Sequence, residues 1–214
     1  MKILLKPSLI ALIILITVIS ANSQVFQPLD LNNKMLSGII IGTDYSLLQN
    51  NEMLPDSISL HNNVGYFVGG LVEKRLFKLF FISPKIYLSI NEAGFRIKNS
   101  STGHIEKKYF MPITIDYGVD FILKILNESN YHPHISAGIK TKRPLVGKAE
   151  RELDLIPKPS YNVDIGIGIS KKIKYFIISP EIKYSFGLND VNSNGSIKGS
   201  ITYNSIAFAL ILKG

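Results

Sequence analysis

The segment Tyr175–Gly187, YFIISPEIKYSFG, decides the fold class of this 214-residue chain. Taken every second residue, it gives one wholly apolar row that consists of Phe176, Ile178, Pro180, Ile182, Tyr184 and Phe186. The alternate row turns polar after Ile177 and carries both signs of charge, in Glu181 and Lys183. A period of two residues with one apolar and one polar face predicts a β-strand.

A similar string occurs earlier in the chain, as FFISPKIYLS over residues 80–89. Phe, Ile, Ser, Pro, Ile and Ser recur at matching places in the two strings. A duplication of four strands would explain the repeat. The simpler interpretation is two strands in equivalent positions of one sheet, because strand patterns converge easily.

The same alternation recurs along the chain, so the sequence predicts eight strands. They cover approximately residues 36–46, 63–75, 79–91, 109–121, 131–142, 161–170, 175–187 and 200–212. Their connections alternate between long and short, and we expect a helical turn around residues 149–155 in the third long one. Outer-membrane barrels combine short periplasmic turns, longer surface loops and strands of about 10 residues. We therefore expect an all-β fold over residues 36–214: an eight-stranded antiparallel up-and-down transmembrane β-barrel, OmpA/OmpX-like.

The first two dozen residues have the features of a secretory signal peptide. Lys2 and Lys6 supply the positive end, residues 9–19 an apolar core, and Ala21-Asn22-Ser23 small residues before Gln24. A transmembrane anchor is the alternative, but the apolar run is about half the length that a spanning helix needs. We expect cleavage after residue 23 and a periplasmic lead-in over residues 24–35. An even number of strands then leaves both termini in the periplasm of a Gram-negative bacterium.

Aromatic residues fall near both ends of the expected strands. With the long loops outward, the surface-side girdle comprises Tyr45, Tyr66, Tyr109, Tyr161, Tyr184 and Tyr203. The periplasmic girdle comprises Phe80, Phe121, Tyr131 and Phe176. Amphipathic rings take these positions at the two interfaces of a bilayer. The alternative is a water-soluble barrel of lipocalin type, whose apolar row lies inside. The polar row is rich in glycine, which suits a narrow lumen better than a wet exterior.

If the apolar row of each strand faces lipid, the alternate row, which carries charged side chains, faces the lumen. The acids are Asp44, Glu73, Asp116, Asp120, Asp164 and Glu181, and the bases are Arg75, Lys85, Lys140, Lys142 and Lys183. Eight strands leave an interior just wide enough for side chains, where unpaired charges are costly. We therefore expect a structural network of ion pairs. A proton or ion path is the alternative use of such charges.

The histidines raise the possibility of a metal site. His132 and His134 lie two residues apart on one strand face and could bind a metal together with an acid. No third ligand is identifiable from the spacing. We expect no metal site and no cofactor.

The long loops raise the possibility of catalysis, because some small outer-membrane barrels are lipid-modifying enzymes. His61 and His104 fall in these loops, close in sequence to Ser57, Ser59, Ser100 and Ser101. The chain has no GxSxG elbow, and no acid is fixed beside either histidine. We expect no catalytic residues and no enzymatic activity.

Composition excludes further classes of function. The chain has no cysteine, and therefore no disulfide framework, thiolate metal site or lipoprotein anchor. Its net charge of +8 includes two lysines of the leader, and the rest forms no basic stripe. We expect no nucleic-acid partner.

With eight strands in place, the sequence resembles the PorT family of outer-membrane β-barrel proteins of Bacteroidetes. The likeness lies in YFMPITIDYGVDF (109–121), HPHISAGIKTKRPL (132–145), YNVDIGIGISKKIKYFIISPEIKYSFGLND (161–190) and the leader boundary Ser23-Gln24. It covers nearly all of the mature chain, as pattern more than as a diagnostic motif. The chain ends Ile211-Leu212-Lys213-Gly214, whereas many bacterial barrels end on an aromatic residue; here Phe208 is the nearest.

This resemblance implies a part in the type IX secretion system, which exports proteins with a C-terminal signal and is tied to gliding. It implies outer-membrane lipid and other envelope or secretion-system proteins as partners, and it carries over no catalytic residues. We therefore expect a non-enzymatic structural or accessory component of such an envelope assembly. The alternative is a small outer-membrane barrel with a role in surface binding, adhesion or membrane integrity. A lipid-modifying barrel enzyme and a small-solute pore also remain open.

Overall fold

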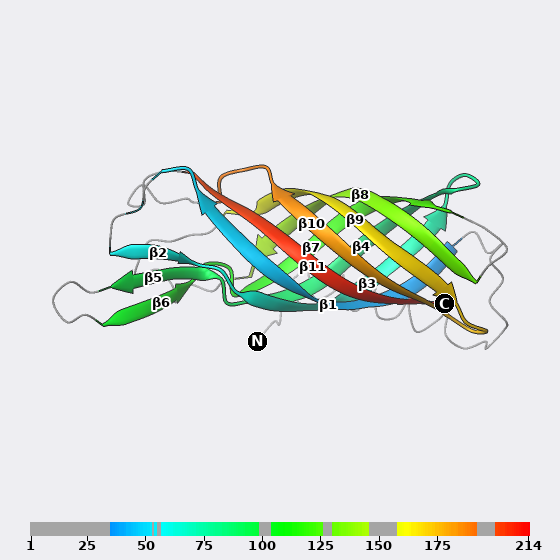
Figure 1. The fold of residues 1–214 in the computed structure, drawn as a ribbon, viewed down its shortest axis with the longest axis horizontal. Helices are drawn as coiled ribbons and strands as arrows, with labels where there is room; N and C mark the ends of the chain where they lie inside the picture. Colours follow the sequence, from blue (N-terminus) through cyan, green and yellow to red (C-terminus); the bar gives the residue numbers. More distant parts are fainter. Residues whose placement is uncertain are drawn as a thin grey trace, which may run out of the picture.

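The computed structural model describes residues 35–52, 54, 57–98, 104–125, 130–145, 158–191 and 200–214. The long strands are β1 (Met35–Asn50), β3 (Val64–Arg75), β4 (Phe80–Asn91), β7 (Ile113–Lys124), β8 (Tyr131–Pro144), β9 (Ser160–Lys172), β10 (Ile177–Gly187) and β11 (Ile201–Lys213). They close into one barrel in the order β1-β11-β10-β9-β8-β7-β4-β3 (Figure 1). Every neighbouring pair is antiparallel. The predicted eight-stranded antiparallel barrel is confirmed.

The first and last strands close the barrel. β1 pairs with β11 from Gly38 opposite Lys213 to Asn50 opposite Ile201. Backbone hydrogen bonds of 3.2 and 2.9 Å between Ser37 and Gly214 extend this ladder to the end of the chain. The start of β1 and the end of β11 therefore lie at the same end of the barrel as the short turns. Closure pairs the backbone groups that would otherwise form open sheet edges, which a bilayer does not tolerate.

Side chains alternate along the strands between an apolar exterior and a polar lumen. Ile165, Ile167 and Ile182 are 53%, 62% and 51% exposed, whereas Asp164 and Glu181 are 4% and 2% exposed. A water-soluble barrel would have the opposite arrangement, with its apolar row inside. The lipocalin alternative is therefore wrong, and the exterior is the one that lipid requires.

The repeated strings of the sequence lie in β4 and β10, which each follow a short turn. Proline has no backbone N–H to donate. The ladder between β3 and β4 is interrupted at Pro84, and the ladder between β9 and β10 is interrupted at Pro180. On the other side of each strand the pairing continues, with Pro84 opposite Val119 and Pro180 opposite Leu210. The two strings thus occupy equivalent positions in the barrel.

Two of the long connections form a second sheet. β2 (Ile58–His61) belongs to the connection from β1 to β3, whereas β5 (Gly94–Lys98) and β6 (Ile105–Tyr109) belong to the one from β4 to β7. They pair antiparallel in the order β2-β5-β6. This sheet projects beyond the barrel at the end opposite the C-terminus (Figure 1). The prediction of plain loops here was wrong, because strands of four and five residues are too short to give a clear period of two.

Several predictions fall on residues outside the described part of the chain. They concern the signal peptide, most of the lead-in, the helical turn around residues 149–155, and Ser100 and Ser101. In the described ranges, no helix is long and apolar enough to cross a membrane.

Candidate functional site

The lumen contains equal numbers of buried acids and buried lysines among the described residues. The six carboxylates are those expected from the sequence, at Asp44, Glu73, Asp116, Asp120, Asp164 and Glu181. The six lysines are Lys85, Lys124, Lys140, Lys142, Lys183 and Lys213. Together they come from all eight barrel strands. Because their formal charges cancel, the network can be buried without a net charge in the lumen.

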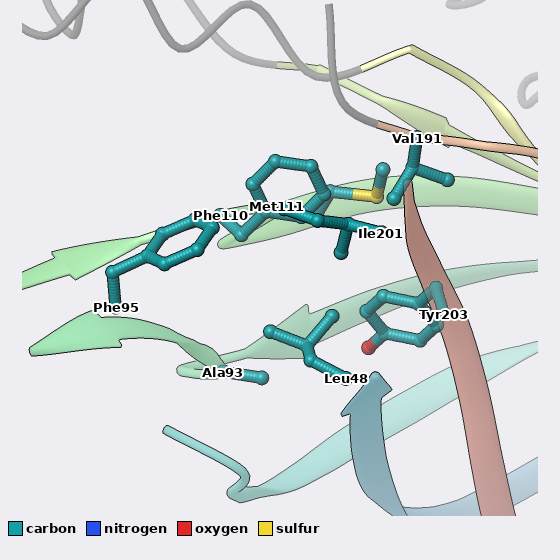
Figure 2. Close-up of a cluster of buried hydrophobic side chains, with 8 residues drawn as sticks. All are labelled: Leu48, Ala93, Phe95, Phe110, Met111, Val191, Ile201 and Tyr203. Atoms are coloured by element: carbon teal, nitrogen blue, oxygen red, sulfur yellow. The ribbon is translucent and has the colours of Figure 1, made fainter. Parts of the chain in front are cut away.

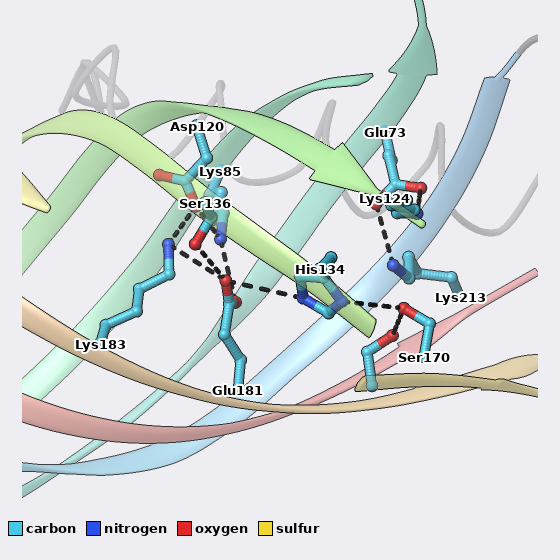
Figure 3. Close-up of polar contacts among 11 residues, drawn as sticks. Glu73, Lys85, Asp120, Lys124, His134, Ser136, Ser170, Glu181, Lys183 and Lys213 are labelled. Atoms are coloured by element: carbon cyan, nitrogen blue, oxygen red, sulfur yellow. Dashed lines mark hydrogen bonds and ion pairs between the residues drawn. The ribbon is translucent and has the colours of Figure 1, made fainter. Parts of the chain in front are cut away.

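At the turn end of the lumen, Glu73 on β3 binds two lysines from other strands (Figure 3). Its Oε2 accepts a 2.9 Å hydrogen bond from Lys213 Nζ on β11, and its Oε1 accepts one from Lys124 Nζ on β7. The Lys124 ammonium also lies 4.2 Å from the ring centroid of Phe81, in a cation–π contact. One carboxylate between two ammonium groups leaves this end of the network with a positive charge.

In the middle of the lumen, two carboxylates and two lysines form a compact group (Figure 3). Asp120 on β7 forms ion pairs with both Lys85 on β4 and Lys183 on β10. Glu181 on β10 lies 3.7 Å from Lys85 Nζ and 3.8 Å from Lys183 Nζ. Glu181 also accepts a 2.6 Å hydrogen bond from the Ser136 hydroxyl on β8. These contacts tie four strands together across the lumen.

Nearer the long connections, three carboxylates surround two lysines. Lys142 Nζ lies 3.2 Å from Asp116 Oδ2 and 3.6 Å from Asp44 Oδ2. Lys140 Nζ lies 3.5 Å from Asp164 Oδ1. This end of the network therefore carries a negative charge, which balances the positive charge at the turn end.

The described part of the lumen is packed with side chains. A Cβ atom added to Gly166 would lie 2.6 Å from Ser136 Oγ and 2.7 Å from Lys183 Cγ, well inside van der Waals contact. A cavity of about 30 Å³ remains beside Asp44 and Asp116, room for about one or two water molecules. The close contacts at Gly166 fit an eight-stranded barrel, whose interior is just wide enough to be filled by side chains.

An apolar cluster lies at the mouth of the barrel on the side of the long connections (Figure 2). Its members are Leu48, Ala93, Phe95, Phe110, Met111, Val191, Ile201 and Tyr203. The rings of Phe95 and Phe110 meet edge to face with their centroids 5.8 Å apart, a favourable aromatic geometry. The cluster borders the charged lumen, because Lys142 Nζ lies 5.0 Å from the centroid of the Tyr203 ring.

Tyr203 belongs to this cluster and not to a girdle, so its prediction was wrong. Its side chain is 1% exposed, and its hydroxyl forms a hydrogen bond with Ser46 Oγ. Tyr203 lies two residues from Ser205 on the lumen face of β11, whereas Ile206 and Phe208 on the alternate row are exposed. The period of two therefore outweighs the tendency of tyrosine to lie at a bilayer interface.

The other aromatic residues expected in the girdles are at least partly exposed. They are Tyr45, Tyr66, Tyr109, Tyr161, Tyr184, Phe80, Phe121, Tyr131 and Phe176. Tyr109 lies in β6, outside the barrel strands. The strand expected over residues 109–121 begins four residues later, at Ile113.

Arg75 lies at the rim of the barrel and does not join the lumen network. Its Nη2 donates a 2.8 Å hydrogen bond to the carbonyl oxygen of Lys78, and its Nε donates a 3.4 Å bond to that of Phe77. The guanidinium thus holds the short turn between β3 and β4. The lysines that complete the network, Lys124 and Lys213, were missed because the expected strands ended at residues 121 and 212.

Of the histidines that suggested chemistry, His132 and His134 are both buried on the lumen row of β8, whereas His61 and His104 lie in the long connections. His134 faces the lumen, with Nε2 3.9 Å from Glu181 Oε1 and Nδ1 3.5 Å from Ser170 Oγ (Figure 3). The described ranges contain no group of three His, Cys, Asp or Glu side chains that could hold a metal ion. His61 lies in β2, opposite Gly94 of β5, and His104 immediately precedes β6.

Comparisons with known proteins bear on the fold. A scan against models of protein families and a search of curated proteins return no match. Among solved structures, the chain is similar to Neisserial surface protein A (NspA), with a TM-score of 0.51 at 11% identity, covering 83% of this chain and 97% of that one. It is also similar to the outer membrane protein OprG from Pseudomonas aeruginosa, with a TM-score of 0.50 at 7% identity, covering 84% and 92%. The chain has the fold of a small, eight-stranded outer-membrane β-barrel.

Proposed function

We propose that this protein is a non-enzymatic outer-membrane barrel that serves as a structural or accessory component of an envelope assembly, with type IX protein secretion as the leading candidate. The observation that carries the proposal is the filled, charge-balanced lumen beneath an apolar cluster. A barrel built in this way offers solutes no path. Its barrel holds the long connections in a fixed position, where partners can bind them.

The proposed orientation follows from the two unlike ends of the barrel. The short turns, the start of β1 and the end of β11 lie at one end of the barrel, and the second sheet lies at the other end. Small bacterial barrels keep short turns in the periplasm and long connections at the cell surface. We place the second sheet outside the cell on this basis, where binding residues are commonly found on loops held by a rigid scaffold.

The secretion role is supported by the sequence resemblance to the PorT family. The test is deletion of the gene in the native host, followed by measurement of secreted proteins that carry a C-terminal signal. We expect their export to fall and to return when the wild-type gene is restored. Unchanged export would refute the role in secretion. Co-purification of the tagged full-length barrel from native membranes would then identify its partners.

A second candidate function is surface binding, which the ordered sheet beyond the barrel favours. Two separate connections supply its three strands. Such a sheet can present side chains in a fixed arrangement outside the cell. Under this candidate, the deletion strain exports its cargo normally but loses adherence or integrity of its envelope.

A further inference from the structure

The sheet formed by β2, β5 and β6 has two unlike faces. Successive side chains of a strand point to opposite faces. One face carries Phe95, which belongs to the apolar cluster at the mouth, and the side chains of Ile58, Leu60 and Ile97, which pack against that cluster. This face is therefore occupied by the protein itself.

The opposite face carries three cations and no acid. Arg96 on β5 lies directly opposite Lys107 on β6 and opposite Ser59 on β2, and Lys98 follows two residues along β5. All three cations are exposed. Like charges directly opposite one another destabilise a sheet. The sheet's acid, Glu106, lies on the other face and forms an ion pair of 2.6 Å with Lys108.

His61 lies on the same face of the sheet as these cations. Partial burial and the charges of Arg96 and Lys107 hold the pKa of His61 below its usual value, although the carboxylate of Glu92 acts in the opposite direction. Arg96 and Lys107 thus lie directly opposite one another and close enough to His61 for their charges to act on it. A bound anion would relieve this repulsion.

The orientation of the cationic face indicates which anions can reach it. The sheet projects beyond one end of the barrel (Figure 1). Its apolar face packs on the cluster at the mouth, so its cationic face is turned away from that cluster. A ligand on it therefore stands beside the barrel, above the surrounding leaflet, and not over the lumen.

We propose that the face formed by Arg96, Lys98 and Lys107 binds the phosphate and carboxylate groups of the anionic saccharides that cover the outer leaflet around the barrel. A guanidinium matches a phosphate or carboxylate with two parallel hydrogen bonds, and an ammonium adds a point charge. The inference rests on the proposed outer-membrane orientation and is independent of the role in secretion.

The test is binding of purified lipopolysaccharide to the full chain in detergent micelles, at several salt concentrations. The variant R96Q/K98Q/K107Q removes the three cations of the face. The matched control K74Q/K78Q/K174Q removes the same charge from exposed lysines at the turn end. Far-UV circular dichroism checks that both variants are folded.

We expect affinity to fall at least tenfold in the first variant and to change less than twofold in the control. Binding should weaken as salt rises, and dephosphorylated lipopolysaccharide should bind more weakly to the wild type. Equal losses in the two variants would show attraction by net charge alone and would overturn the proposal. So would tighter binding of polyglutamate than of lipopolysaccharide, or no binding at all. None of these results would alter the export measured in the deletion strain, so the two proposals fail separately.

Discussion

Glu73 is the residue at which the role of the lumen network can be tested most directly. Its carboxylate is 2% exposed and lies between the ammonium groups of Lys124 and Lys213. The substitution Glu73→Gln keeps the size of the side chain and removes the charge that both lysines face. Removing one partner of a buried ion pair costs about 3–5 kcal/mol, because the remaining charge stays buried without compensation. We expect a loss of about that size in the free energy of unfolding.

The substitution Lys124→Met is the matched control. It leaves the 2.9 Å bond between Glu73 and Lys213 intact and removes a like charge from beside Lys213. Methionine also keeps much of the contact with the ring of Phe81. We expect this variant to lose only about 1–2 kcal/mol, because relief of the repulsion from Lys213 offsets part of the about 2–4 kcal/mol that the cation–π contact and one charged hydrogen bond contribute.

The assay is urea unfolding of each protein in phospholipid vesicles. The chain has no tryptophan, so far-UV circular dichroism or the gel mobility of the folded barrel replaces tryptophan fluorescence. A loss of about 3–5 kcal/mol is on the order of a hundred- to a few-thousand-fold in the unfolding equilibrium. Equal losses in the two variants, or a loss below about 1 kcal/mol for Glu73→Gln, would refute the reasoning that charge balance holds this end of the lumen together.

Further predictions concern packing, lipid contact and conduction. Gly166→Val should cost about 1–3 kcal/mol because the lumen is already filled at that point, and urea unfolding in vesicles measures the loss. Ile167→Lys, on the exposed face in the middle of β9, should cost about 2–4 kcal/mol, whereas Tyr161→Lys near the strand end should cost at most about 1 kcal/mol. Equal costs for these two would argue against a bilayer around β9. Tyr203→Phe should lose about 1 kcal/mol with its hydrogen bond to Ser46, and a loss near zero would show that this bond contributes nothing net. The wild-type barrel should show no single-channel conductance in planar bilayers, and steady conductance would contradict a filled lumen.

The arrangement of the barrel followed from the sequence because one physical rule governs most of it. Side chains alternate across a strand, so Asp164 and Ile165 must lie on opposite faces of β9, and lipid decides which face is outside. That rule placed six carboxylates in the lumen without any knowledge of three-dimensional contacts.

The features that were missed depend on strand ends and on packing. Lys124 lies on the same strand row as Asp116 and Asp120, but its place in the lumen depends on whether β7 continues past Phe121. Arg75 also lies on the row of β3 whose side chains face the lumen, yet it is at the rim and forms hydrogen bonds with the turn between β3 and β4. Tyr203 faces inward because it lies on the same row of β11 as Ser205, but the apolar cluster that it joins comes from segments far apart in the sequence. No local pattern reports such a cluster.

The position of Lys213 has a consequence for the making of the protein. Glu73 precedes this partner by 140 residues, so during synthesis the acid exists long before the last residues of the chain. A chain cut short before β11 would lack a cation that the interior requires. β11 therefore supplies both the lysine that completes the charge balance of the described lumen and the strand that closes the barrel.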